Sequence, residues 1–237
     1  MELNKNFDAT YAPKTLDDIA FTHKDDKYDL QDHITGRSGF PSNGINGILL
    51  VGDTGSGKTT LAKMLPTLIE QARGGTGASY DFYQITTSGN SGVDLLEKIE
   101  NQIMFLPFQQ QFHYIILDEV NLMSVAAMNK LKSVMNIAFG YVIFIMTTND
   151  INTVSKPVQN RCHVIWLDHA PASAWLPLYR RILQDHGITH IDKATMLNKI
   201  DKCNGSGRDV IESAKKIILR HNEDMPIDAF TATTVVV

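Results

Sequence analysis

The chain has 237 residues, a formal net charge of −4, and 43% hydrophobic and 20% charged residues. These values are typical of a soluble globular protein of one or two domains, and they exclude binding of nucleic acid or anionic membranes through overall positive charge. No signal peptide is predicted, because the first residues are charged, and the longest apolar runs are too short to span a membrane. Cys162 and Cys203 form no disulfide or metal pattern, which favours a reducing, cytoplasmic setting.

The first 46 residues are predicted to contain little regular structure. Residues 1–20 should form an irregular arm that includes Pro13, and Thr15 with Asp18 three positions later signals a capped short helix. Residues 28–46 should form a short helix and then a loop, because glycines and a proline interrupt the pattern.

A glycine-rich stretch, Gly52-Asp-Thr-Gly-Ser-Gly-Lys58-Thr59, follows the apolar run 48–51 and precedes the amphipathic segment 60–71. This is the strand, turn and helix context that a phosphate-binding P-loop needs. Glycines let successive backbone N–H groups turn toward phosphate oxygens, and the positive N-terminal end of the helix dipole attracts the same oxygens. Lys58 can reach the β- and γ-phosphates, and the Thr59 hydroxyl can ligate Mg²⁺. We therefore predict that ATP or GTP is bound by Gly52, Asp53, Thr54, Gly55, Ser56, Gly57, Lys58, Thr59 and Thr60.

A second apolar run, 113–117, ends in the carboxylates Asp118 and Glu119. The pattern indicates a buried parallel strand with acids at its carboxyl end, where open α/β sheets place their ligand sites. Asp118 is positioned to hold Mg²⁺ and its waters, and Glu119 to orient or deprotonate an attacking water. After the next strand, 141–146, Asn149 can touch the γ-phosphate or its water; alternatively it only belongs to a turn.

The remaining segments complete an α/β fold with a parallel sheet flanked by helices, followed by a helical unit. Strands are predicted at 79–87 and 163–167, and helices near 95–103, at 124–138 and, after a boundary near residue 170, at 173–185, 192–203 and 208–221. The last three should form a small bundle, in which Pro177 fits only near the first turn of its helix.

The order of these parts resembles that of AAA+ ATPases, and within them the clamp-loader group, over about residues 7–225. This group contains the replication factor C small subunits and the phage clamp loaders. Asp118-Glu119-Val-Asn-Leu-Met-Ser is similar to the group's Walker B motif, and Asn149 falls at its sensor 1 position. The stretch Pro157-Val-Gln-Asn-Arg161-Cys162 resembles Pro-x-Gln-Ser-Arg-Cys, whose arginine is the finger that one subunit supplies to its neighbour's ATP.

Two further stretches resemble elements that lie near the nucleotide. Tyr11-Ala12-Pro13-Lys-Thr-Leu is similar to Tyr-Arg-Pro-x-Thr-Leu, the box beside the adenine, with alanine in place of arginine. Gly207-Arg208 resembles the sensor 2 motif Gly-Asp-x-Arg, shortened by one residue. Because Arg208 opens a helix, where a cation is unfavourable, a role facing the site is one explanation and a solvated arginine is the other.

The sequence departs from the group's pattern at several positions. Residues 84–92 resemble an element that leads into a DNA-facing helix, but Thr86 and Ser91 replace its asparagine and arginine. Met128 and Lys132 replace a glutamine and an arginine in a helix that couples neighbouring sites. We find no match to the collar domain that joins clamp-loader subunits: either the sequence is truncated or the native protein lacks a collar. We expect the isolated chain to be a monomer or weak oligomer that assembles with ATP and DNA.

The resemblance implies an AAA+ domain over residues 1–168, a helical lid over 169–225 and a tail over 226–237. The cofactors would be ATP and Mg²⁺. The site residues would be Tyr11 and Pro13 beside the base, Thr59 and Asp118 at the metal, and Glu119, Asn149, Arg161 and Arg208 in catalysis.

The implied function is ATP hydrolysis at subunit interfaces, used to load or remodel a replication component on DNA. The partners would be copies of this chain or related AAA+ subunits, primer–template DNA, and a replication protein such as a sliding clamp. Two alternatives stay open: a helicase loader or other DNA-bound matchmaker, and an ATP-dependent switch or scaffold with little turnover.

Overall fold

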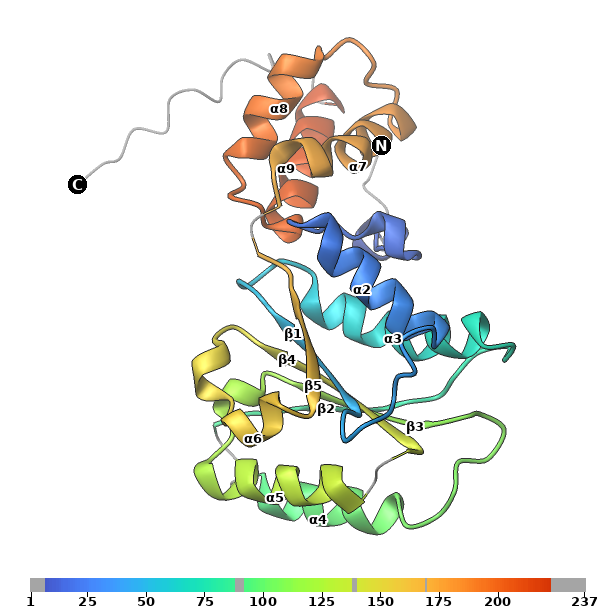
Figure 1. Ribbon diagram of the computed structural model, residues 1–237. Helices are drawn as coiled ribbons and strands as arrows, with labels where there is room; N and C mark the ends of the chain where they lie inside the picture. The colour runs from blue at the N-terminus through green and yellow to red at the C-terminus, as the bar shows by residue number, and fades with distance from the viewer. Residues whose placement is uncertain (1–6, 88–91, 138–139, 169, 223–237) are drawn as a thin grey trace, which may run out of the picture.

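The computed structural model describes residues 7–87, 92–137, 140–168 and 170–222 (Figure 1). An α/β body carries a bundle of helices at one end, and the bundle follows the last strand in the chain. This arrangement confirms the predicted α/β class, with a parallel sheet flanked by helices.

The body is built on a five-stranded sheet in the order β2-β3-β4-β1-β5. The strands are β1 (Gly47–Val51), β2 (Asp81–Gln84), β3 (His113–Asp118), β4 (Val142–Thr148) and β5 (Cys162–Trp166). All the pairings are parallel, so the carboxyl ends of β1, β3 and β4 meet at one edge of the sheet. Ligand sites of open parallel sheets lie at that edge.

Helices cover both faces of the sheet (Figure 1). One face carries α2 (Lys24–Thr35) and α3 (Lys58–Ala72), and the other carries α4 (Val93–Gln102), α5 (Val125–Ile137) and the short α6 (Lys156–Gln159). Successive side chains of a strand point to opposite faces of the sheet, so they pack in opposite layers. Leu49 packs with the α4–α5 layer, whereas Ile48 and Leu50 pack with the α2–α3 layer.

The bundle consists of α7 (Ala172–Asp185), α8 (Lys193–Asp201) and α9 (Gly207–Asn222) around its own apolar cluster. The short N-terminal helix α1 (Phe7–Thr10) adds Phe7 to this cluster, so the two ends of the described chain pack together. Pro177 lies in the second turn of α7, one turn later than expected. Burial of Trp175 and Tyr179 on either side of it holds the helix despite the lost backbone hydrogen bond.

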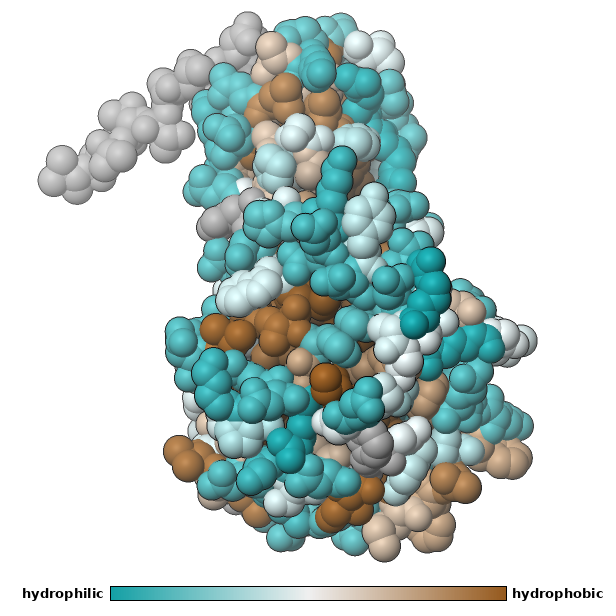
Figure 2. Space-filling model, in the orientation of Figure 1, coloured by the Kyte–Doolittle hydropathy of each residue, from teal (hydrophilic) through white to brown (hydrophobic). Residues whose placement is uncertain are grey.

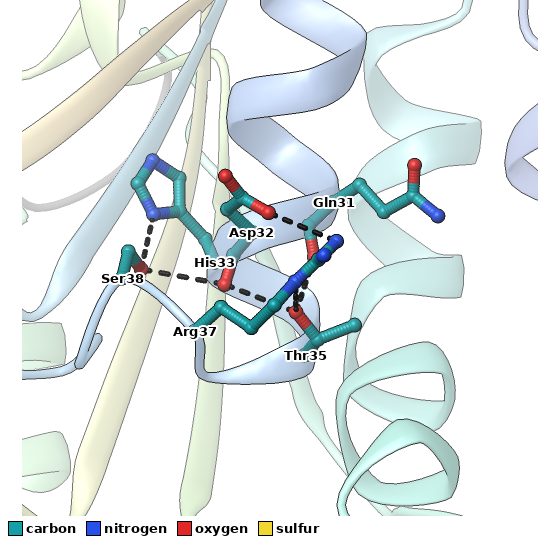
Figure 3. Close-up of polar contacts among 6 residues, drawn as sticks. All are labelled: Gln31, Asp32, His33, Thr35, Arg37 and Ser38. Carbon is teal, nitrogen blue, oxygen red and sulfur yellow. Dashed lines mark hydrogen bonds and ion pairs between the residues drawn. The ribbon is translucent and has the colours of Figure 1, made fainter.

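The carboxyl end of α2 is fixed by short polar contacts, which Figure 3 shows. The Nδ1 atom of His33 lies 2.8 Å from the Ser38 hydroxyl, and Arg37 pairs with Asp32 at 3.0 Å. On its other side, the His33 ring stacks on His163 of β5 with the ring centroids 3.6 Å apart. The stacking with His163 attaches α2 to β5, the outermost strand on that side of the sheet.

Several predicted boundaries differ from the structure. α2 begins at Lys24, before the predicted start at residue 28, and β2 covers only four residues of the predicted strand 79–87. β4 continues through Thr148, so two polar residues belong to the strand. Short 3₁₀ turns lie at Leu16–Asp18, Val120–Leu122 and Ile151–Thr153, and the first has the capping box predicted at Thr15.

Three predictions fall outside the described residues: the turn at 88–91, the last residue of the helix 124–138 and the tail 226–237. Among the described helices, none combines the length and the apolar character that crossing a membrane requires.

Candidate active site

The glycine-rich loop lies between the carboxyl end of β1 and the first residue of α3, as the sequence predicts. Two of its glycines are required by close packing. A Cβ atom on Gly52 would lie 2.2 Å from the Leu167 carbonyl oxygen, and one on Gly55 would lie 2.5 Å from the Ser206 hydroxyl. Gly55 also has a φ of +85°, which disfavours side chains. The loop is therefore held between the end of β5 and the start of α9.

Lys58 is the first residue of α3, and its side chain folds back over the loop. Its Nζ donates hydrogen bonds of 2.8 Å to the carbonyl oxygens of Gly52 and Asp53. Burial lowers the pKa of the Lys58 ammonium, and the nearby carboxylates of Asp118 and Asp53 oppose that shift. The ammonium is thus placed at the centre of the loop, where the P-loop lysine is expected to meet phosphate oxygens.

Thr59 and Asp118 lie side by side, although they are far apart in the sequence. The Thr59 hydroxyl donates a 2.8 Å hydrogen bond to Oδ1 of Asp118, which is buried at the carboxyl end of β3. Mg²⁺ prefers oxygen ligands and commonly binds one or two protein oxygens together with substrate phosphates and waters. A hydroxyl and a carboxylate in contact beside a phosphate-binding loop fit that ion.

Thr147 was not predicted as a site residue, yet it joins the two acidic residues. Its hydroxyl donates a 2.7 Å hydrogen bond to Oδ1 of Asp118 and accepts a 2.9 Å bond from the backbone N–H of Glu119. The side chain is buried near the end of β4. The strand register could have identified Thr147, because Leu117 pairs with Met146 and the next residues of the two strands are Asp118 and Thr147.

Glu119 adopts a left-handed backbone conformation with a φ of 63°, which is uncommon for a residue other than glycine. Such conformations are frequent at functional sites, because the surrounding structure must hold them. Here the hydrogen bond from the Glu119 N–H to Thr147 and the 3₁₀ turn that follows fix the residue. Its side chain is half-buried, and the residue directly follows Asp118 at the carboxyl end of β3.

Asn149 follows β4, which lies between β3 and β1 in the sheet. The carbonyl oxygen of Thr148 accepts a 3.3 Å hydrogen bond from the N–H of Gly52, so Asn149 comes directly after a residue that touches the loop. Asn149 is exposed. The structure therefore places it beside the loop and beside the strand that ends in Asp118.

A cavity of about 320 Å³ opens beside the loop, between the body and the helical bundle. It is lined by Asp8, Ala12 and Pro13 of the arm, by Gly55, Gly57, Lys58, Thr59 and Thr60, and by Trp175, Leu178, Gly207, Arg208, Ile211 and Glu212 of the bundle. The Gly207 N–H donates a 3.0 Å hydrogen bond to the Gly55 carbonyl oxygen, so the first turn of α9 rests on the loop. Arg208 thus lies at the cavity.

The residues of the arm and the bundle that line the cavity differ in part from those predicted for the site. Pro13 lines the cavity, but Tyr11 does not: its ring is buried against Phe7, and its hydroxyl donates a 3.2 Å hydrogen bond to Asp185. Trp175 and Ile211, which belong to predicted helices but were not predicted as site residues, also line the cavity. Their helical spacing is that of core residues, and no sequence pattern distinguishes an apolar residue of the core from one at a cavity wall.

Arg161 lies far from the other predicted site residues. Its carbonyl oxygen accepts hydrogen bonds from the N–H groups of Asn46 and Gly47, at the amino end of β1. The loop starts at Gly52, beyond the five residues of β1, and a strand rises about 3.3 Å per residue. The Arg161 backbone is therefore about 16 Å from the start of the loop, at the opposite edge of the sheet.

Comparison with known proteins identifies the family. Residues 48–168, just over half of the chain, match the family described as "ATPase family associated with various cellular activities (AAA)". The chain is 25% identical over 178 residues to DNA polymerase III subunit gamma of Buchnera aphidicola, an alignment that covers 69% of this chain and 49% of that protein. It is 32% identical over 160 residues to replication factor C subunit 3 of Schizosaccharomyces pombe, covering 64% of this chain and 42% of that one.

The chain thus spans half or less of the length of these relatives. Among solved structures, the Thermotoga maritima RuvB Holliday junction branch migration motor superposes with a TM-score of 0.68 at 17% identity, over 91% of this chain and 68% of that one. This likeness shows the same fold. The chain belongs to the AAA family of ATPases, and its relatives fall in the clamp-loader group that its motifs resemble.

Proposed function

We propose that this chain hydrolyses ATP at interfaces between subunits and uses the energy to load or remodel a replication component on DNA, as a clamp-loader-like ATPase. One observation carries the proposal. Thr59, Asp118, Thr147 and Glu119 form a continuous hydrogen-bonded network beside the P-loop, while Arg161 lies at the opposite edge of the sheet. Most of a catalytic site is therefore present within one chain, and Arg161 lies at the other end of the strands from it.

The residues of the network have distinct roles in this proposal. Lys58 and the loop N–H groups bind the phosphates, and Thr59 with Asp118 holds Mg²⁺, which neutralises charge on the phosphate oxygens. Glu119 accepts a proton from, or orients, the attacking water, and Asn149 positions that water or the γ-phosphate. Arg208 and the cavity wall of the bundle then bring the lid onto the nucleotide, since the first turn of α9 already contacts Gly55.

Arg161 acts on a neighbouring subunit's nucleotide in this proposal. An arginine that stabilises charge on the transferring phosphate raises the rate of NTPases by about three to five powers of ten. With its backbone about 16 Å from the P-loop of its own chain and on the other edge of the sheet, the Arg161 guanidinium is better placed for a phosphate bound by another subunit. This arrangement makes hydrolysis depend on assembly.

A replication partner is supported by the relatives and by one surface of the body. The matched proteins are a DNA polymerase III subunit and a replication factor C subunit. The loop between α4 and β3 exposes four large apolar side chains, those of Met104, Phe105, Leu106 and Phe108. Figure 2 shows apolar surface at the lower right of the body, where Figure 1 shows this loop. Exposed apolar patches commonly mark protein-binding surfaces, so this loop offers a docking site for the protein that the ATPase acts on.

Two variants separate nucleotide binding from hydrolysis. Lys58→Ala should lose ATP binding, whereas Glu119→Gln should bind ATP with wild-type affinity and lose at least about 100-fold in turnover, because its amide cannot accept a proton. Binding of a fluorescent ATP analogue and steady-state phosphate release, each with and without primed DNA, measure the two effects. Wild-type turnover in Glu119→Gln would contradict the proposal, and tight binding without turnover in the wild type would indicate a nucleotide switch.

A further inference from the structure

The guanidinium of Arg161 is held by two hydrogen bonds within its own chain. Its Nε donates a 2.7 Å bond to Oδ1 of Asn136, in the last turn of α5, and its Nη1 donates a 2.6 Å bond to the carbonyl oxygen of Pro157 in α6. The Arg161 backbone is fixed as well, because its carbonyl oxygen accepts two bonds from the start of β1. Three elements therefore determine where this side chain points.

These two bonds leave most of the guanidinium's donors for another partner. Arginine carries five N–H donors in a rigid plane, and these two bonds use one on Nε and one on Nη1. A guanidinium binds phosphate oxygens through pairs of its N–H donors, and the donors that remain on Nη1 and Nη2 are available for such a contact. Asn136 takes only the Nε donor, so it orients the plane and leaves the two Nη2 donors and one Nη1 donor for a phosphate.

The chemistry of the contact suits this purpose. The amide oxygen of Asn136 is a neutral acceptor, so it fixes the orientation of Arg161 while leaving its positive charge uncompensated. A free arginine side chain populates many rotamers, and holding one of them in advance reduces the entropy lost when the phosphate is bound. Asn136 is exposed, and among the described residues it is this neutral side chain that accepts the bond from Nε.

We propose that Asn136 is a positioning residue for Arg161, and that it therefore serves the active site of the neighbouring subunit rather than that of its own chain. The inference rests on the proposed function, in which Arg161 acts on the neighbour's nucleotide. It assigns the two ends of α5 to different sites: the amino end follows Glu119 and its 3₁₀ turn, and the carboxyl end carries Asn136.

The test uses Asn136→Ala with Asn129→Ala as a matched control, an exposed asparagine two turns earlier on α5. Asn136→Ala should reduce turnover to about one tenth of the wild-type rate, because a hydrogen bond to a charged group commonly contributes a factor of ten or more. Its affinity for a fluorescent ATP analogue should be unchanged, because its own P-loop is intact. Asn129→Ala should keep the wild-type rate.

Mixing variants identifies the site that Asn136 serves, at constant total protein. The first mixture combines Asn136→Ala with Glu119→Gln, which supplies an intact Arg161 and Asn136. Its turnover should rise to about a quarter of the wild-type rate, because about one interface in four then joins an intact Glu119 site to an intact finger. With Arg161→Ala, turnover should instead fall to about one twentieth, since no subunit then supplies an intact finger. A purely local effect on folding would not produce this difference.

Other outcomes of these experiments would contradict either the role of Asn136 or the shared active site. A wild-type rate for Asn136→Ala when Arg161→Ala is slow would overturn this inference alone. The same holds if the turnover of Asn136→Ala rises on mixing with Arg161→Ala but not on mixing with Glu119→Gln. An equal loss in Asn129→Ala would assign the effect to the surface of α5 in general and overturn the role of Asn136. A wild-type rate for Arg161→Ala would instead overturn the shared active site, and this inference with it.

Discussion

At the scale of single residues, Thr147 connects the two acidic residues of the site through one hydroxyl group. It accepts from the Glu119 N–H and donates to Asp118, which also accepts from Thr59. The sequence predicted three of these four residues, because their types and spacing form known motifs. Thr147 was not predicted, because threonine is common in strands for packing reasons alone. Its residue type therefore carries no functional signal.

We expect Thr147→Val to keep the shape of the side chain and to lower turnover about 10- to 100-fold, with little change in ATP affinity. The change removes the hydrogen-bond partner of the partly buried Glu119 N–H and of one lone pair of the buried Asp118, and such a loss commonly costs about 1–3 kcal/mol. Steady-state turnover and binding of an ATP analogue measure the two quantities. Thr147→Ser keeps the hydroxyl and should stay near the wild-type rate; equal loss in both variants would mean that the methyl packing, and not the hydroxyl, matters.

At the scale of elements, strands were easier to predict than surface helices. Three of the five strands, β1, β3 and β4, are buried except for His113 at the start of β3, and they correspond to apolar runs in the sequence. The start of α2 was predicted too late because only Leu30, His33 and Ile34 of that helix are buried, and its first turn carries Asp25 and Asp26. So few apolar positions give no clear helical period, and packing on β5 through the His33 ring determines the helix.

The contact between α2 and β5 predicts a pH dependence of stability. Burial, with a smaller effect from the neighbouring His163, lowers the pKa of His33 to about 4; Asp29 and Asp32 act in the opposite direction. Burial also lowers the pKa of His163. Because an unfolded histidine titrates near 6.5, the unfolded state binds more protons below that pH, so the contribution of His33 is complete above about pH 6.5 and decreases toward pH 4.

At pH 5 the difference between the folded and unfolded pKa values of His33 corresponds to a loss of about 2 kcal/mol of folding free energy. Urea unfolding of the wild type and of His33→Asn between pH 7.5 and 5 measures it, with the difference between the two proteins as the readout. The asparagine amide can replace the Nδ1 contact with Ser38 but does not titrate, so the variant should lose about 2 kcal/mol less on acidification. Parallel pH profiles for the two proteins would contradict the assignment.

At the scale of the whole molecule, the position of Arg161 follows from chain order, but the closure of the nucleotide cavity does not. Arg161 immediately precedes β5, and in a parallel sheet the residue before a strand must lie at the edge opposite the carboxyl ends. The contact of the bundle with the P-loop depends on Gly55 meeting Ser206 and Gly207. The resemblance of Gly207-Arg208 to sensor 2 predicted that this segment lies near the nucleotide, but its direct contact with Gly55 is seen only in the folded arrangement of body and bundle.

The account's central claim, that one active site is shared between two subunits, is tested most directly by mixing two inactive variants. Arg161→Ala keeps Glu119 and its P-loop, and Glu119→Gln keeps Arg161. Each alone should hydrolyse ATP at no more than about 1% of the wild-type rate. An equimolar mixture at the same total protein should recover up to about a quarter of the wild-type rate, because about one interface in four then combines an intact site with an intact finger. A mixture that stays as inactive as its components at every protein concentration, with ATP and primed DNA present, would contradict a shared site.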